Sequence, residues 1–87
     1  MRGTFAYIAP EVLTGARCTA KVDIFSLGIV LWELCTSETP HRGRNRPVRV
    51  PEECPASIAA LIDRCQEFEP NDRPTAKEVV QAILNST

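Results

Sequence analysis

Few side chains among these 87 residues belong to the types that carry out covalent chemistry. The single histidine, His41, lies in a loop rich in proline, arginine and glycine, and neither Ser26 nor Ser57 has a histidine near it in the sequence. A serine nucleophile needs a base within hydrogen-bond reach, so a histidine-based triad is not expected. The glycine-rich patterns that cradle phosphate, G-x-x-x-x-G-K-[ST] and G-x-G-x-x-G, do not occur either. The sequence therefore predicts no catalytic residue and no self-sufficient active site.

The four cysteines, Cys18, Cys35, Cys54 and Cys65, are spaced too widely for a C-x-x-C pair. Structural zinc usually draws on closely spaced ligand pairs, so we expect no metal site. Cys35 and Cys65 fall in apolar helical patterns, where cysteine is a small buried hydrophobe. No signal-peptide pattern follows Met1. These features favour an intracellular, cytoplasmic chain with reduced thiols.

Charge and composition restrict the classes of partner. Apolar residues make up 44% and charged residues 24%, as in a globular chain, and the length suits one small domain or part of a larger one. The net charge of −1 gives no electrostatic footprint for nucleic acid or anionic lipid. The most apolar segment, 22–35, contains Asp23 and Glu33 and is shorter than the roughly 20 residues of a membrane span. We expect neither nucleic-acid binding nor membrane insertion.

Hydrophobic spacing and chain breakers predict a mainly α fold without a sheet. We expect a short helical turn at 10–13 and longer helices over about 21–36, 55–67 and 75–85. The last helix opens with Thr75-Ala76-Lys77-Glu78, which is the pattern of a capping box. The loop from Ser37 to Pro55 holds four arginines and is expected to be solvated: Arg42, Arg44, Arg46 and Arg49.

The central predicted helix is apolar on every side, and such a helix must be covered on every side. The two later helices each offer one apolar stripe, which for the last helix is made of Val79, Val80, Ile83 and Leu84. Two partners of that size cannot cover the whole of segment 22–35. The sequence therefore predicts that these residues form part of a larger core.

Four motifs in order resemble one family. Gly3 to Glu11 resembles G-T-x-x-Y-x-A-P-E, the end of a eukaryotic protein-kinase activation segment. Asp23 to Gly28 is similar to the D-[IV]-[WFY]-S-x-G opening of the kinase core helix, and Trp32-Glu33-Leu34 to its middle. Pro70 to Pro74 resembles the P-x-x-R-P turn before the last kinase helix. The resemblance implies that residues 1–87 are a partial kinase domain, the distal part of its C-terminal lobe.

The resemblance also implies roles for individual residues. Glu11 and Arg73 match a buried ion pair, although a charge on a helix dipole and a solvated turn residue are the simpler interpretations. Asp23 matches the acid that accepts backbone N–H groups from the catalytic loop, or is simply an acid in the first helical turn. Trp32 matches a structural position of the core helix.

The start of the chain matches the substrate side of a kinase. Gly3 and Thr4 match the loop that holds the substrate, and Tyr7 matches a residue that packs beneath it. The Gly-Thr pair, Arg46 to Pro51, and Cys54-Pro55 followed by Cys65 resemble the Ser/Thr kinases of the tyrosine-kinase-like group. Ala6 departs from that group, which usually has arginine there, and Gln66 departs from its usual tryptophan.

In such a family the complete domain transfers phosphate from ATP, with Mg²⁺, to Ser or Thr of proteins. The motifs that bind ATP and Mg²⁺ do not occur in these 87 residues, so we expect no cofactor here and no catalysis by this chain alone. The expected partner is a protein substrate or the remainder of a kinase domain. The alternative is a non-catalytic helical module, derived from a kinase, that acts as a docking or decoy element.

Overall fold

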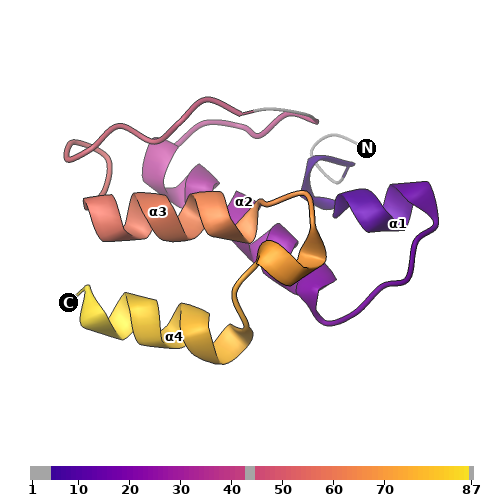
Figure 1. The fold of residues 1–87 in the computed structure, drawn as a ribbon. Coiled ribbons are helices and arrows are strands. Elements are labelled where there is room, and N and C mark those ends of the chain that lie inside the picture. Colours follow the sequence, from indigo (N-terminus) through magenta and orange to yellow (C-terminus); the bar gives the residue numbers. More distant parts are fainter. Residues whose placement is uncertain (1–4, 43–44, 87) are drawn as a thin grey trace.

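The computed structural model describes residues 5–42 and 45–86 and arranges them as helices joined by loops (Figure 1). The four α-helices are α1 (Pro10–Thr14), α2 (Lys21–Thr36), α3 (Ala56–Cys65) and α4 (Ala76–Asn85), and the two 3₁₀ turns are η1 (Phe5–Tyr7) and η2 (Pro70–Asp72). No strand occurs within the described residues. The predicted mainly α fold without a sheet is confirmed.

The helix ends follow local chemistry. α1 has Pro10 in its first turn and stops at Gly15, whose φ of 78° is left-handed backbone that glycine adopts without a steric penalty. The predicted capping box of α4 is present: Glu78 N–H donates to Thr75 Oγ1 at 3.1 Å, and Thr75 N–H donates to Glu78 Oε1 at 2.8 Å. α3 ends at Cys65, two residues before its predicted end at Glu67.

α2 is the central element, and its two sides face different groups of residues. One side packs with α3 and α4 in a cluster built on Ile24, Leu61, Cys65 and Val79. The other side packs with the chain before α1, in a cluster of Ala9, Phe25 and Ile29. In Figure 1, α2 runs behind α3 and reaches from the end near α1 to the far side of the molecule.

α2 and α3 are in close contact at Gly28. A Cβ atom placed on Gly28 would lie 2.5 Å from the Cβ atom of Cys65, which real Cβ atoms essentially never do. Glycine is therefore required here by contact between the two helices, and not by a positive φ. The sequence placed Gly28 in the D-[IV]-[WFY]-S-x-G pattern but did not predict this contact, because helical spacing alone does not reveal which residues face a second helix.

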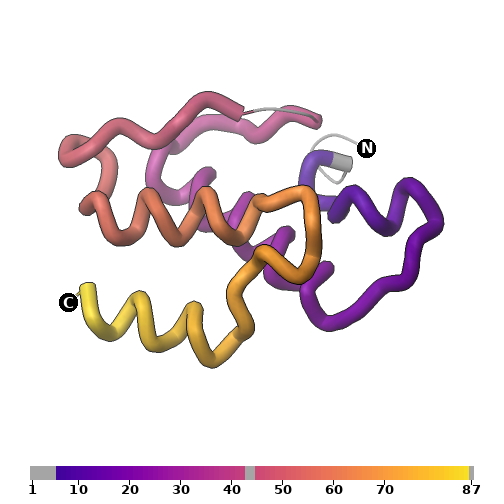
Figure 2. Tube along the Cα trace, in the orientation of Figure 1, coloured from indigo at the N-terminus to yellow at the C-terminus, as the bar shows by residue number. Residues whose placement is uncertain are grey.

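α3 and α4 lie side by side in antiparallel orientation (Figure 2). The hydroxyls of Ser57, near the start of α3, and Ser86, just after α4, lie 2.8 Å apart. Of the four apolar residues predicted to form the stripe of α4, only Val79 is buried. Leu34 at the end of α2 is 72% exposed, so apolar surface also remains open on the central helix, as expected for part of a larger core.

None of the helices in the described part of the chain has both the length and the apolar character that a bilayer crossing requires.

Candidate functional site

The guanidinium of Arg73 contacts three segments of the chain, two of which lie more than 50 positions away in the sequence. Two of its nitrogens bind the carboxylate of Glu11 in a fork, with Nη1 to Oε2 at 2.7 Å and Nη2 to Oε1 at 2.8 Å. Its remaining hydrogens go to the backbone carbonyls of Glu67 (2.8 Å), Phe68 (3.1 Å) and Lys21 (2.9 Å). All five N–H donors of the guanidinium are therefore used. The contact between Glu11 and Arg73 that the sequence predicted is present.

This Arg73 junction lies away from water. The side chain of Arg73 is 0% exposed and that of Glu11 is 5% exposed. The guanidinium also lies over the ring of Phe25, 5.1 Å from its centroid, which adds a cation–π contact. Hydrogen bonds from Arg73 hold the pKa of Glu11 below its ordinary value, against the opposing effect of burial. Glu11 is accordingly a carboxylate near neutral pH, and the simpler interpretation of Arg73 as a solvated turn residue is wrong.

Lys21 closes the same junction from the start of α2. Its Nζ donates to the carbonyl oxygens of Arg73 at 2.8 Å and Pro70 at 3.4 Å. The side chain of Arg73 binds the backbone of Lys21, and the side chain of Lys21 binds the backbone of Arg73. This reciprocal arrangement fixes the turn before α4 against the start of α2. Sequence reasoning did not single out Lys21, because a lysine in the first turn of a helix is ordinarily solvated.

Tyr7 attaches the beginning of the described chain to α2. Its hydroxyl donates a hydrogen bond to Glu33, and that bond, together with burial and the charge of Glu33, raises the pKa of Tyr7. The hydroxyl of Ser26 donates to the Tyr7 carbonyl at 2.6 Å. Gly3 and Thr4, which the sequence assigned to substrate binding with Tyr7, lie outside the described residues.

Asp23 lies in the first turn of α2 and is exposed. Within residues 5–42 and 45–86, no hydrogen bond or ion pair reaches its carboxylate. The side chain is thus open to backbone N–H donors from elsewhere, and its position in the first turn also complements the helix dipole.

Trp32 connects α2 to the loop that follows it. The indole is 3% exposed, and its Nε1–H donates to the carbonyl of Arg46 at 2.6 Å. The guanidinium of Arg46 in turn binds two carboxylates, Glu38 at 2.8 Å and Glu53 at 2.7 Å. The hydrogen bonds from Arg46, followed by the bond from the backbone N–H of Arg49, lower the pKa of Glu53 to about 2. Trp32, Glu38, Arg46 and Glu53 together form what we call the Arg46 junction.

The expectation of a solvated loop holds for Arg42 and Arg49, which are exposed, and is corrected at Arg46, whose side chain is 26% exposed. Arg46 is held at both ends of its loop, because Glu38 lies just after α2 and Glu53 lies just before α3. Arg42 also donates to the backbone carbonyl of Ile8, and Arg44 lies outside the described residues. The signal for this junction in the sequence was the order of an acid, an arginine and an acid at positions 38, 46 and 53. The sequence alone does not show that the loop conformation brings these three side chains together.

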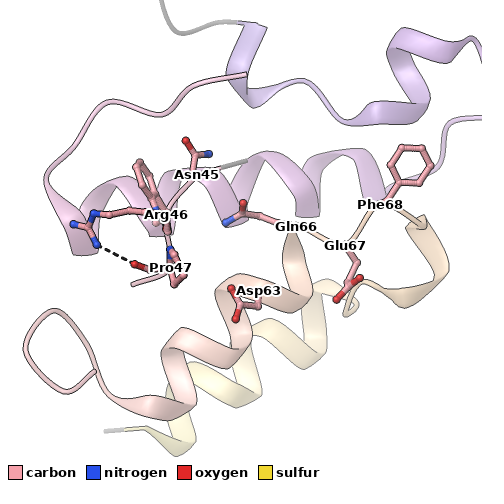
Figure 3. A pocket seen from close by; sticks show the side chains of 8 residues that line it. Asn45, Arg46, Pro47, Asp63, Gln66, Glu67 and Phe68 are labelled. Carbon is pink, nitrogen blue, oxygen red and sulfur yellow. Dashed lines mark hydrogen bonds between the residues drawn. The ribbon is translucent and has the colours of Figure 1, made fainter. Parts of the chain in front are cut away.

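A cavity of about 480 Å³ lies between α2, α3 and the loop of the Arg46 junction (Figure 3). Trp32, Asn45 and Arg46 line it from one side, and Asp63, Gln66 and Glu67 line it from the other. A smaller cavity of about 240 Å³ lies between Gln66, Phe25 and the start of the chain. Gln66 therefore borders two cavities, at the position where the sequence departs from the tryptophan of the tyrosine-kinase-like group.

The thiols are not poised for nucleophilic chemistry. Burial, followed by the neighbouring Cys35, raises the pKa of Cys54 to about 11, and burial also raises the pKa of Cys65. A thiolate, not a thiol, is the reactive form, so these buried cysteines are inert near neutral pH. Within the described ranges, no three His, Cys, Asp or Glu side chains gather where they could hold a metal ion.

Sequence comparison supplies the observation that decides the family. The protein kinase domain model matches residues 1–84, which is almost the whole chain. The chain belongs to the protein kinase family.

Several named kinases are similar to this kinase-family chain. The serine/threonine-protein kinase mos of Patiria pectinifera is 39% identical over 100 residues, covering 100% of this chain and 28% of that protein. The probable serine/threonine-protein kinase drkD of Dictyostelium discoideum is 41% identical over 91 residues, covering 92% of this chain and 7% of that protein. A putative mitogen-activated protein kinase kinase kinase 7-like protein of Drosophila melanogaster is 34% identical over 97 residues, covering 91% and 25%. The chain thus spans little more than a quarter, and often far less, of these relatives.

Proposed function

We propose that residues 1–87 are the distal part of the C-terminal lobe of a protein serine/threonine kinase. In this proposal the complete enzyme transfers phosphate from ATP, with Mg²⁺, to Ser or Thr of a protein substrate. The observation that carries the proposal is the Arg73 junction. It links the segment that resembles A-P-E to the turn that resembles P-x-x-R-P, across 62 positions of sequence.

The Arg73 junction and the hydrogen bonds of Tyr7 support this placement, because together they fix the position of the segment before α1. Glu11 directly follows the Ala9-Pro10 pair, and Tyr7 is bonded to both Ser26 and Glu33 of α2. The segment that would lie beside a protein substrate is thus attached to the central helix at two places. We assign Gly3, Thr4 and Tyr7 to the substrate side, and Glu11, Arg73, Asp23 and Trp32 to structural roles.

The Ser/Thr specificity and the tyrosine-kinase-like group rest on sequence likeness. Similar proteins carry serine/threonine-protein kinase names, and Gly3-Thr4 matches that class. Cys54-Pro55 and Cys65 match the group, and both of these cysteines are buried in the packed part of the chain. Ala6 and Gln66 remain departures from it.

We also propose that the 87-residue chain does not catalyse phosphoryl transfer by itself. The H-R-D and D-F-G motifs and the glycine-rich loop, which position ATP and Mg²⁺, do not occur in it. Its partner is then the rest of a kinase domain, in the cytoplasm. Calorimetric titration of the chain with ATP and Mg²⁺ is expected to give no saturable heat, and micromolar binding would contradict the proposal.

A chimeric enzyme tests the kinase role directly. Residues 1–87 replace the matching segment of a complete Ser/Thr kinase of the same group, and phosphate transfer to a protein substrate is measured. We expect a folded, active chimera, and a second chimera carrying Arg73→Ala is expected to lose stability and activity together. A first chimera that is folded, binds ATP and transfers no phosphate would contradict the assignment and favour the non-catalytic module.

A further inference from the structure

We propose that the cavity beside Trp32 binds an arginine side chain of a partner protein. The inference starts from the shape and lining of the 480 Å³ cavity in Figure 3 and does not depend on the kinase assignment. We call this cavity the Trp32 cavity.

The charge of the Trp32 cavity favours a cation. Asp63 on α3 and Glu67 just after it both line the cavity and are exposed, and no ion pair involves either of them within the described residues. Figure 3 shows their side chains along the last turn of α3 and the segment that follows it. Two unpaired carboxylates at one cavity attract a positive charge, and the attraction is least screened where water is partly excluded.

The cation in the lining does not cancel this charge. Arg46 also borders the cavity, but its guanidinium is already bound by the carboxylates of Glu38 and Glu53. Arg49 also lies 3.9 Å from Glu53, so two arginines face two acids in this cluster. Asp63 and Glu67 remain as the excess carboxylates of the cavity. An anionic ligand would therefore meet an occupied arginine and an excess of carboxylates, so the cavity disfavours phosphate or a carboxylate ligand.

The uncharged lining favours a flat cation over a compact one. The Trp32 indole forms one wall, and the ring of Phe68, which is 64% exposed, borders the opening. Guanidinium groups stack on aromatic faces and bind carboxylates through paired N–H donors, whereas an ammonium group is a hydrated point charge. The amide of Gln66 lines the same space, and no hydrogen bond of its side chain occurs in the described part of the chain.

Asn45 adds an independent sign that a partner belongs here. Its side-chain nitrogen is buried without a hydrogen-bond partner, while its oxygen accepts a bond of 2.8 Å from the backbone N–H of His41. Buried donors are almost always paired, so this unpaired nitrogen needs an explanation, and a bound ligand with an acceptor is one that fits a cavity. A backbone carbonyl of a partner segment at this end of the cavity would supply that acceptor. This favours an arginine carried by a peptide over a free guanidinium compound.

Trp32 is the single tryptophan of the chain and lines the cavity, so it reports both folding and binding. The probe is the capped tripeptide acetyl-Gly-Arg-Gly-amide, titrated into the full chain while Trp32 emission and the indole N–H resonance are followed. Blue-shifted emission shows that α2 is packed. If the isolated chain lacks that shift, the same peptide is titrated into the chimeric kinase. Binding is then followed by the side-chain amide resonances of Asn45 and Gln66.

We expect saturable binding of the arginine peptide and at least about tenfold weaker binding of the same peptide with neutral citrulline. The double variant Asp63→Asn with Glu67→Gln should also lower the affinity about tenfold. Glu52→Gln removes an exposed acid outside the lining and serves as the matched control, which should bind as the unchanged chain does. Raising the salt concentration should weaken binding.

Three results would overturn the proposal. The citrulline peptide could bind as tightly as the arginine peptide, the double variant could bind as tightly as the control, or a folded chain could show no saturation at all. Methylguanidinium that binds as tightly as the peptide would overturn the peptide assignment, because it offers no carbonyl to Asn45. These readouts concern binding alone, so a failed chimera activity test would leave them unaffected.

Discussion

The Arg73 junction and the Arg46 junction use the same chemistry in different surroundings. In each, one guanidinium binds carboxylate and backbone carbonyl groups and connects segments that are separate in the sequence. The side chain of Arg73 is 0% exposed and meets a single carboxylate, which is 5% exposed. The side chain of Arg46 is 26% exposed and shares two carboxylates, of which Glu38 is 51% exposed.

The difference shows that hydrogen-bond geometry alone does not determine what an ion pair contributes. In the Arg73 junction, removing one partner leaves the other charge buried without a partner or water, which lowers the free energy of unfolding by several kcal/mol. In the open junction, water replaces the missing partner, and the pair contributes little.

Arg73→Ala should destabilise the fold by about 3–5 kcal/mol, because it leaves the buried carboxylate of Glu11 uncompensated. Arg73→Lys should restore only part of the loss, because an ammonium group cannot reproduce the fork. The measurement is denaturant unfolding of a complete kinase C-terminal lobe that contains residues 1–87. A loss below about 1 kcal/mol would mean that the junction behaves as an exposed pair.

The double variant Glu11→Gln with Arg73→Met is the control for this experiment. Removing both charges is often nearly neutral where removing one is not, so the double variant should be more stable than Arg73→Ala. The single changes Glu11→Gln and Arg73→Met, together with this double variant, form a thermodynamic cycle. A coupling energy indistinguishable from zero would refute the view that the pair acts as a unit.

Gly28→Ala tests the helix crossing that lies between the two junctions. The added Cβ would overlap Cys65, and overpacking of this kind costs about 1–3 kcal/mol, of which the better helix propensity of alanine offsets up to about 1 kcal/mol. Gly15→Ala is the comparison, since Gly15 has open space and its cost comes from a φ of 78° alone. Thermal unfolding of both variants would separate the two causes, and a Gly28→Ala variant more stable than the unchanged chain would contradict the crossing.

Acidification should weaken the buried junction before the rest of the packed core. The pKa of Glu11 is lower in the folded state than in the unfolded chain, so its contribution is complete above the unfolded value of about 4.3 and declines as pH falls through the folded value. Urea midpoints between about pH 6 and pH 3 should therefore fall less in the double variant Glu11→Gln with Arg73→Met, which lacks this titration. Parallel pH profiles for the two proteins would show that Glu11 does not contribute.

Arg46→Gln should give the smallest effect, a loss of stability several-fold below that of Arg73→Ala. Water can solvate Glu38 and Glu53 once the guanidinium is gone. Added salt should reduce the effect further, because exposed pairs are screened. Denaturant unfolding at low and high salt measures both, and a loss equal to that of Arg73→Ala would remove the contrast between the junctions.

Much of the fold could be predicted from sequence because its signals are local. The spacing of apolar residues and the absence of proline gave α2 its observed bounds, Lys21–Thr36, and the Thr75–Glu78 pattern fixed the start of α4. The end of α3 was placed too late, at Glu67, since nothing local stops the helix at Cys65. The carbonyls of Glu67 and Phe68 leave the helix direction and bind Arg73, which is a tertiary contact.

One part of the candidate site was also predicted from the sequence, and the other part was not. The contact of Glu11 with Arg73 was predictable because a family resemblance supplied a pairing that the spacing of 62 positions could not. The Arg46 junction and the Trp32 cavity were not predicted, because they depend on how the loop folds back between α2 and α3. Burial of Val79 without Val80 in α4 likewise depends on what covers the helix, and the periodicity of α4 does not reveal that.

The long sequence separation of the Arg73 junction has a consequence for the order of folding. Bringing Glu11 to Arg73 closes a loop that contains α2 and α3, and the chain entropy of such a closure is roughly 3–4 kcal/mol. α2, α3 and the loop 37–55 make contacts that are nearer in sequence, so we expect the junction to close after they have formed. Changes that weaken a late contact speed unfolding and leave the folding rate nearly unchanged. We therefore expect changes at Arg73 to act mainly on the unfolding rate, and changes at the Gly28 helix crossing to act mainly on the folding rate.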